Sequence, residues 1–293
     1  MNRAALPYLA FAGCAAIWGS TFLAIRIGND ALPALWACTL RLVAAATALN
    51  LILIVTRQPW PKGDALKAAF WYGFLEFGVG LPLLYWGEKA VNSGLAAVVY
   101  AISPIVTMIG AKAFGMENWS LPRLGAGSFA LMGVGMIFWQ QIVGGGSPAG
   151  LLAITIAVVA AAVGAVLLKR GPRQSSIGAN AVGTLVAVPP SLLATVVFER
   201  QHPVPVTTGQ IFPIFYLAIA SSVLAFGLFA WLFNHWRVTT VAFLGVIVPV
   251  IAVTLGALVR QESFARWELL GAVIVIVSVA IAIRLEASAS EVK

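Results

Sequence analysis

Two ionisable residues stand inside long apolar runs, where a charge is costly. Glu76 lies about eleven residues into a predicted helix over residues 66–87, roughly 16 Å deep at the helical rise per residue. Arg41 lies about eight residues into a predicted helix over 33–56, on the order of 12 Å deep from the other side. Ionisable side chains inside membrane spans pair with one another, line wet cavities or relay protons. We therefore expect both residues at a functional site.

Each of the two residues has more than one interpretation. Glu76 either takes up and releases a proton in a functional cycle, or sits in a structural ion pair or as a neutral carboxyl hydrogen-bonded between helices. Arg41 stays charged and offers a bidentate fork to a carboxylate, either that of Glu76 or that of a bound amino acid. The alternative for Arg41 is a guanidinium that extends to the outer membrane surface.

Aromatic residues at mid-helix depth suggest a pocket. Tyr100 lies about seven residues into the predicted helix over 93–114, too deep for the aromatic belt at the membrane surface. A buried tyrosine hydroxyl needs a hydrogen-bond partner, which an apolar pocket with a few polar groups supplies. We expect Tyr100, Ser103 and Trp18 to enclose a neutral or aromatic side chain. The same predicted aromatic cluster includes Tyr85 and Phe243.

Prolines inside the predicted helices free backbone carbonyls, which in lipid must be covered by protein or line a cavity. Pro104 and Pro249 occupy corresponding positions in two similar segments, and we expect each to break its helix on opposite sides of a central cavity. A static packing kink is the alternative for each proline.

The composition excludes a soluble globule. Mean hydropathy is +0.96 and 10% of residues are charged, whereas about a quarter are charged in soluble domains. An exposed backbone amide in hydrocarbon costs several kcal/mol, so apolar runs of about twenty residues without period-two alternation must be helices. The predicted fold is an all-α integral membrane protein with ten transmembrane helices, over residues 6–27, 33–56, 66–87, 93–114, 121–141, 149–168, 177–198, 209–233, 238–259 and 267–284.

The chain contains a duplication. Segments 85–119 and 230–264 align 145 positions apart, which places Trp86 on Trp231 and Glu117 on Glu262. The flexible connector 143–148, Val-Gly-Gly-Gly-Ser-Pro, separates the fifth predicted helix from the sixth. We expect two repeats, residues 1–142 and 149–293. Because each repeat has five crossings, the second enters the membrane from the opposite side and is inverted relative to the first.

The distribution of Lys and Arg over the predicted loops explains the net charge of +8. If the N-terminus is placed on one side, twelve Lys and Arg residues fall on that side and five on the other. The positive-inside rule then predicts that both termini are cytoplasmic. Since membrane topology accounts for the excess of basic over acidic residues, we expect no nucleic-acid partner.

Three sequence runs are similar to a known family. They are Ala-Ile-Trp-Gly-Ser-Thr-Phe at 16–22, Thr-Leu-Arg-Leu at 39–42, and Ser-Gly-Leu-Ala-Ala-Val at 93–98 leading to Ser103-Pro104. They resemble EamA-type members of the drug/metabolite transporter superfamily over nearly all ten helices. Within that family the chain looks most like bacterial exporters of aromatic and other neutral amino acids. The resemblance implies a multi-pass secondary transporter of the bacterial inner membrane, which exports small amphipathic metabolites by alternating access through a central cavity.

Other functions on the same fold stay open, namely a carrier of other metabolites or drugs, or a nucleotide-sugar carrier. A nucleotide-sugar carrier should show several cavity lysines for its phosphates, whereas here Arg41 is the deeply buried cation. An enzyme is not expected, since the sequence has neither an HExxH helix nor a Gly-x-Ser-x-Gly turn. Without a Gly-rich loop ending in Gly-Lys-Ser/Thr, transport must run on a gradient of substrate alone or of protons.

The scarce cysteines and histidines predict no metal site and no cofactor. Cys14 and Cys38 are predicted roughly 10 Å apart in depth, too far for a disulfide. We expect a small-molecule substrate and the lipid bilayer as partners, and a monomer or homodimer. Glycines of the fifth predicted helix either pack within the fold or join two protomers; they are Gly125, Gly127, Gly133 and Gly135.

Overall fold

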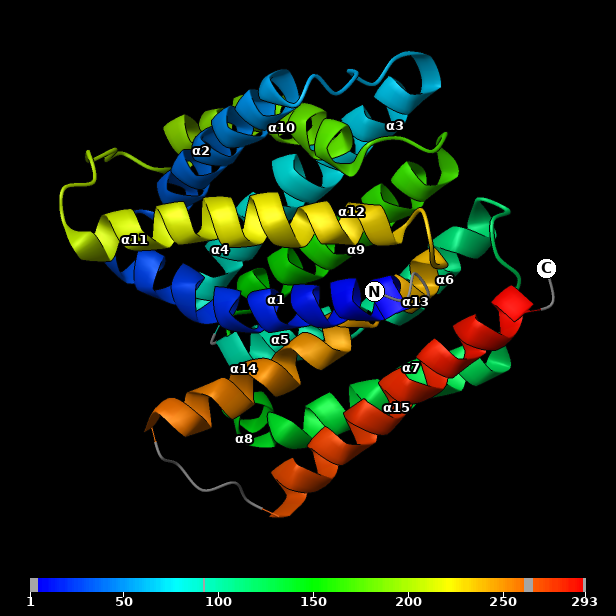
Figure 1. The fold of residues 1–293 in the computed structure, drawn as a ribbon. Helices are drawn as coiled ribbons and strands as arrows, with labels where there is room; N and C mark the ends of the chain where they lie inside the picture. Colours follow the sequence, from blue (N-terminus) through cyan, green and yellow to red (C-terminus); the bar gives the residue numbers. More distant parts are fainter. Residues whose placement is uncertain (1–4, 92, 261–265, 292–293) are drawn as a thin grey trace.

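The computed structural model describes residues 5–91, 93–260 and 266–291, which form helices and short connectors (Figure 1). Eight of the helices are long and apolar enough to cross a membrane. The shorter apolar helices Leu121–Ile137 and Val238–Thr254 bring the crossings to ten. The predicted all-α membrane fold with ten transmembrane helices is confirmed.

Several crossings are built from more than one element. The first half contains α1 (Leu6–Ala31), α2 (Ala34–Val55), α3 (Gly63–Gly73), η2 (Phe74–Gly80), α4 (Leu81–Ala90), α5 (Ser93–Tyr100), α6 (Ser103–Ala113), α7 (Leu121–Ile137) and α8 (Trp139–Val143). The second half contains α9 (Pro148–Arg170), α10 (Ser176–Phe198), α11 (Thr208–Tyr216), η3 (Leu217–Ala225), α12 (Phe226–Leu232), α13 (Val238–Val241), α14 (Leu244–Arg260) and α15 (Arg266–Glu291).

Helices of the two halves interleave. The second and fifth crossings meet their counterparts, since α2 packs against α10 and α7 against α15 (Figure 1). The contact of α4 with α9 is mirrored by that of α12 with α1, and the contact of α6 with α9 by that of α14 with α1. Exchanging the halves reproduces these pairings, as two symmetry-related repeats require, and the inversion of the second repeat stays a prediction. The start of α1 and the end of α15 lie at the same end of the bundle (Figure 1).

The two repeats break their fourth crossing differently. The first breaks between α5 and α6, directly before Pro104, as expected. Its counterpart does not break at Pro249, which lies inside α14, but one to two turns earlier, between α13 and α14. At that point the two crossings touch: a Cβ on Gly245 would lie 2.0 Å from Ser103 Oγ, and Ser103 donates a hydrogen bond to the Ala242 carbonyl at 3.1 Å. The break between α13 and α14 thus lies where the fourth crossings of the two repeats come into close contact.

Both repeats contain a widened helical segment of the π type. Residues 74–80, shifted by the 145-residue repeat offset, fall on 219–225, inside η3. Pro82 follows η2 and cannot donate a backbone hydrogen bond, which disfavours regular α-helical pairing there. Turns of this type occur frequently at functional sites.

Glycines allow the tightest helix crossings. A Cβ on Gly73 of α3 would lie 2.1 Å from Gly183 Cα of α10. Likewise, a Cβ on Gly133 of α7 would lie 2.7 Å from the Gly271 carbonyl oxygen of α15. Gly133 therefore packs within the fold, one of the two roles expected for these glycines, and the homodimer stays a prediction.

The Gly73 crossing makes a testable prediction. In Gly73→Ala the new methyl group overlaps backbone atoms, so α3 and α10 must separate, at a cost of about 1–3 kcal/mol or more. We expect a clearly lower melting temperature in detergent. The matched control is Gly125→Ala, where an added Cβ meets nothing within 4 Å. Equal melting of the two variants would show that the crossing is looser than described.

Candidate functional site

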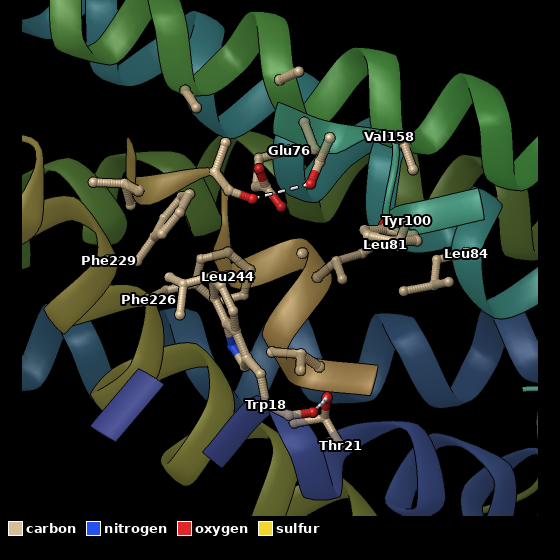
Figure 2. Close-up of a pocket in the computed structure, with 18 of the residues that line it drawn as sticks. Trp18, Thr21, Glu76, Leu81, Leu84, Tyr100, Val158, Phe226, Phe229 and Leu244 are labelled. Atoms are coloured by element: carbon tan, nitrogen blue, oxygen red, sulfur yellow. Dashed lines mark hydrogen bonds between the residues drawn. The ribbon is translucent and has the colours of Figure 1, made fainter. Parts of the chain in front are cut away.

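A cavity opens at the centre of the bundle, with an empty volume of about 910 Å³ including its mouth (Figure 2). It is lined from both repeats, by residues of α1, α2, η2, α4 to α6, α9 and η3 to α14. Most of the wall is aliphatic or aromatic. The polar side chains on it are few: Thr21, Arg41, Glu76, Tyr100, Ser103, Thr107 and Ser221. This composition is typical of small-molecule sites.

Glu76 reaches the cavity from the widened turn η2. Its side chain is 9% exposed and lines the cavity wall (Figure 2). In the part of the chain that the structure describes, Glu76 has neither a hydrogen-bond partner nor an ion pair within 4 Å. The repeat offset places Ser221 of η3 at the corresponding position, and Ser221 also lines the cavity. The two repeats thus present an acid and a hydroxyl from matching turns.

Arg41 is buried at 2% exposure and held by neutral hydroxyls. Its Nε donates to Ser222 Oγ at 3.1 Å, Nη2 to Ser221 Oγ at 2.9 Å, and Nη1 to Tyr85 Oη at 3.3 Å. A guanidinium has five N–H groups and cannot be deprotonated in proteins. Three hydroxyl partners therefore fix its position without neutralising its charge, and the side chain faces the same cavity as Glu76.

Aromatic rings form one side of the cavity (Figure 2). The Trp18 ring lies 4.9 Å from that of Phe226 and 5.1 Å from that of Phe229, between ring centroids. Phe77 contacts Phe226 from behind at 4.7 Å, and Tyr100 contacts Phe22 at 6.3 Å. Edge-to-face and tilted contacts of this kind hold the rings in place, so the apolar wall is preformed.

The predicted site residues divide into two groups. Trp18, Tyr100, Ser103, Arg41 and Glu76 all line the cavity, and Tyr85 lies behind it as a partner of Arg41. The other three are not among the lining residues: Pro104, Phe243 and Pro249.

Helical periodicity explains why two of the three miss the wall. On α13 and α14 the cavity-facing residues recur every three to four positions, with some adjacent pairs: Val238, Val241, Ala242, Leu244, Gly245 and Val248. Phe243 and Pro249 fall outside this pattern. Pro104 is buried near α7 instead, since it lies 3.7 Å from a Cβ built on Gly127.

Sequence reasoning left out several wall residues. Phe229 and Thr107 carry no signal beyond their helical phase. Ser221 could have been found from the sequence, because the repeat offset maps it directly onto Glu76.

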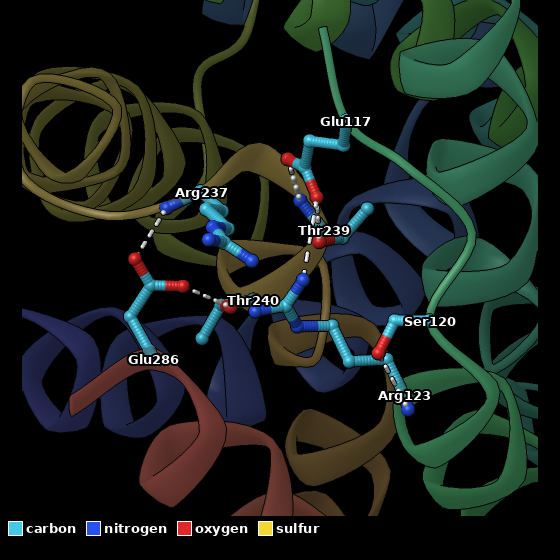
Figure 3. Close-up of polar contacts among 7 residues, drawn as sticks. All are labelled: Glu117, Ser120, Arg123, Arg237, Thr239, Thr240 and Glu286. Atoms are coloured by element: carbon cyan, nitrogen blue, oxygen red, sulfur yellow. Dashed lines mark hydrogen bonds and ion pairs between the residues drawn. The ribbon is translucent and has the colours of Figure 1, made fainter. Parts of the chain in front are cut away.

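A polar cluster holds the start of α13, which leads into the cavity wall (Figure 3). The Glu117 carboxylate accepts hydrogen bonds from the backbone N–H and hydroxyl of Thr239 and lies 3.8 Å from Arg123. The Glu286 carboxylate accepts the Arg237 N–H at 3.1 Å and the Thr240 hydroxyl at 2.7 Å. Carboxylates at a helix N-terminus are favoured by its unpaired N–H groups and dipole. Residues before α7 and at the end of α15 thus anchor this cavity-lining segment.

Comparison with known proteins gives a consistent result. The model of the EamA-like transporter family matches the chain twice, over residues 5–139 and 148–284. The inner membrane transporter YedA of Escherichia coli (strain K12) is 28% identical over 262 residues, covering 88% of this chain and 85% of YedA. A protein of Salmonella typhimurium named "Probable amino-acid metabolite efflux pump" is 24% identical over 270 residues, covering 88% of each chain. A crystal structure aligns with a TM-score of 0.77 and 18% identity over 98% of this chain and 99% of that one, so the two share the fold.

Proposed function

The chain belongs to the EamA-like transporter family, and from this premise we propose that it exports neutral amino acids, aromatic ones included, from the bacterial cytoplasm across the inner membrane. Export follows alternating access through the central cavity. The family and the relatives are transporters, which agrees with the expectation of a protein that is not an enzyme. The name of the Salmonella relative, which refers to amino-acid metabolite efflux, supports the substrate class.

The observation that carries this proposal is a pair of opposite charges that share one cavity without contacting each other. Arg41 is held by hydroxyls, and Glu76 has no hydrogen-bond partner among the described residues. A zwitterionic substrate carries a charge complementary to each residue. Its carboxylate binds the remaining N–H groups of the Arg41 guanidinium, and its ammonium binds the Glu76 carboxylate. A substrate with one charge would satisfy one of the two residues and leave the other unpaired.

The remaining wall suits a large apolar side chain. The rings of Trp18, Phe226 and Phe229 offer edge and face contacts, each worth about 0.5–1.5 kcal/mol beyond area burial. Tyr100, Ser103 and Thr107 add hydroxyls on the same wall. Several weak contacts let a carrier select its substrate and still release it. Phosphorylated substrates fit less well, because Arg41 is the cation of the described cavity wall.

Glu76 also offers a route to proton coupling. Its carboxylate can hold either a proton or the substrate ammonium, but the two compete for the same oxygens. Substrate leaving to the outside then vacates Glu76 for a proton, which is released when the next amino acid arrives from the cytoplasm. Export would thereby be driven by protons moving inward.

A transport assay tests the substrate assignment. Proteoliposomes carrying the wild type should move labelled phenylalanine, and Glu76→Gln and Arg41→Lys should each lower kcat/KM about ten- to a hundred-fold, as expected for loss of a charge-assisted or bidentate bond. Asp64→Asn is the matched control, since Asp64 is exposed and pairs with exposed Lys67. Transport of nucleotide sugars or quaternary ammonium drugs with no amino acid accepted would contradict the proposal.

The direction of transport depends on topology. With both termini cytoplasmic, the loop carrying Lys62 faces the cytoplasm and the loop carrying Gly144 faces outward. Gly144 suits a cysteine because its φ of −64° fits any residue, unlike neighbouring Gly145 at +68°. In intact cells an impermeant thiol reagent should label Gly144→Cys and not Lys62→Cys, over a low background from buried Cys14 and Cys38. The reverse pattern would invert the orientation.

A further inference from the structure

A second buried acid lies at the end of α4, outside the polar group of the cavity. Glu88 is 4% exposed, and neither of its carboxyl oxygens has a hydrogen-bond partner in the described ranges. Asn29 of α1 lies beside the same turn, because its Nδ2 donates to the Tyr85 carbonyl at 3.2 Å. The Asn29 Oδ1 is buried without a partner as well. Three buried acceptors thus occupy the junction of α1 and α4, and no described residue donates a hydrogen bond to any of them.

The packing around this junction is tight. A Cβ on Gly87 would lie 2.6 Å from Ile154 Cγ1 of α9, and one on Gly150 would lie 2.7 Å from Val91 Cγ2. The glycines bring α9 directly against the end of α4, so the Glu88 carboxyl is sealed by helix packing in this conformation. A carboxylate kept there ionised and without a donor would cost several kcal/mol.

None of the charged side chains described around Glu88 forms an ion pair with its carboxyl group. Arg26 of α1 is exposed and acts on Glu88 through space, without an ion pair within 4 Å among the described residues. On α4 itself, neighbouring Lys89 is exposed. The other elements that pack against α4 bring Arg41 from α2, which bonds Tyr85, Glu76 from η2, and Tyr100 from α5. The charged residues of α9, Lys169 and Arg170, lie at its far end.

These observations select one ligand. A metal ion needs about six oxygen ligands, and the described residues contain no group of three or more His, Cys, Asp or Glu side chains that could hold one. A proton needs a single oxygen. Once bound, it removes the charge and converts Glu88 from an acceptor into a donor for a neighbouring acceptor such as Asn29 Oδ1. We propose that Glu88 is a proton-binding site, which holds one proton while α4 is packed against α1 and α9 and returns it to water when this junction opens.

The site is placed to communicate with the cavity. Leu84, one turn before Glu88, lines the cavity, and so does Tyr100 of α5, a helix that packs against α4. The predicted orientation puts Glu88 at the external end of the bundle. If export is proton-coupled at Glu76, as proposed above, Glu88 is the acid that the incoming proton meets first. The role of Glu88 in proton coupling rests on the proposed function, whereas proton binding at Glu88 does not.

Infrared titration of the purified full-length chain in detergent tests proton binding directly, without substrate. At about pH 7, where an ordinary glutamate is ionised, the wild type should show a protonated-carboxyl C=O band that is clearly weaker in Glu88→Gln, and any remainder belongs to Glu76, which holds a proton when no substrate is bound. Asp30→Asn, which changes an exposed acid near the end of α1, should leave the band unchanged. Glu88→Asp should keep the band at a shifted frequency, which preserves the test if the Gln variant fails to fold. A Glu88→Gln spectrum identical to that of the wild type, or a band removed by adding Na⁺, overturns the proposal.

Transport separates this site from the proposed function. An inward proton gradient should accelerate phenylalanine export several-fold in the wild type and Asp30→Asn but not in Glu88→Gln, while exchange without a gradient stays equal in all three. Equal stimulation of Glu88→Gln and wild type overturns the coupling role of Glu88 and leaves amino-acid export standing. If no amino acid is transported at all, the export proposal fails and the infrared result alone decides the proton site.

Discussion

A guanidinium buried between helices must find acceptors within the protein, because it cannot lose its proton and has no bulk water to solvate it. Arg41 of the first repeat finds two of its three in the second repeat, at Ser221 and Ser222 of η3. The pairing therefore ties α2 to η3 across the two halves. Since all three acceptors are neutral hydroxyls, the fold holds a positive charge in place without cancelling it, and that charge faces the cavity.

Duplication explains how the opposite charge comes to lie nearby. The widened turns η2 and η3 correspond at the 145-residue offset, and both direct one polar side chain to the centre of the bundle. In the first repeat that side chain is the carboxyl of Glu76, and in the second it is the hydroxyl of Ser221, which holds Arg41. A symmetric scaffold thus supports an asymmetric site, as recognition of a molecule with two different ends requires.

Helix number and the depth of single residues could be predicted from the sequence, because both follow from the length of apolar runs. Depth pointed to Arg41, Glu76 and Tyr100, whose side chains lie on the cavity wall, and their roles in binding stay a proposal. Helical phase could not be predicted: at about 100° per residue, the nomination of Phe243 instead of Leu244 misses the wall. Glu88 was overlooked because the predicted helix ended at Gly87, whereas the observed α4 continues to Ala90 and buries it.

The central claim, that Arg41 and Glu76 bind the two charged ends of one substrate, is tested most directly by calorimetric binding of three ligands to the purified chain. Phenylalanine carries both charges, phenethylamine only the ammonium, and phenylpropionate only the carboxylate. If each end contributes a charge-assisted bond of about 1.5–3 kcal/mol, both analogues should bind at least about ten-fold more weakly than phenylalanine. Binding of either analogue as tightly as phenylalanine would contradict the claim.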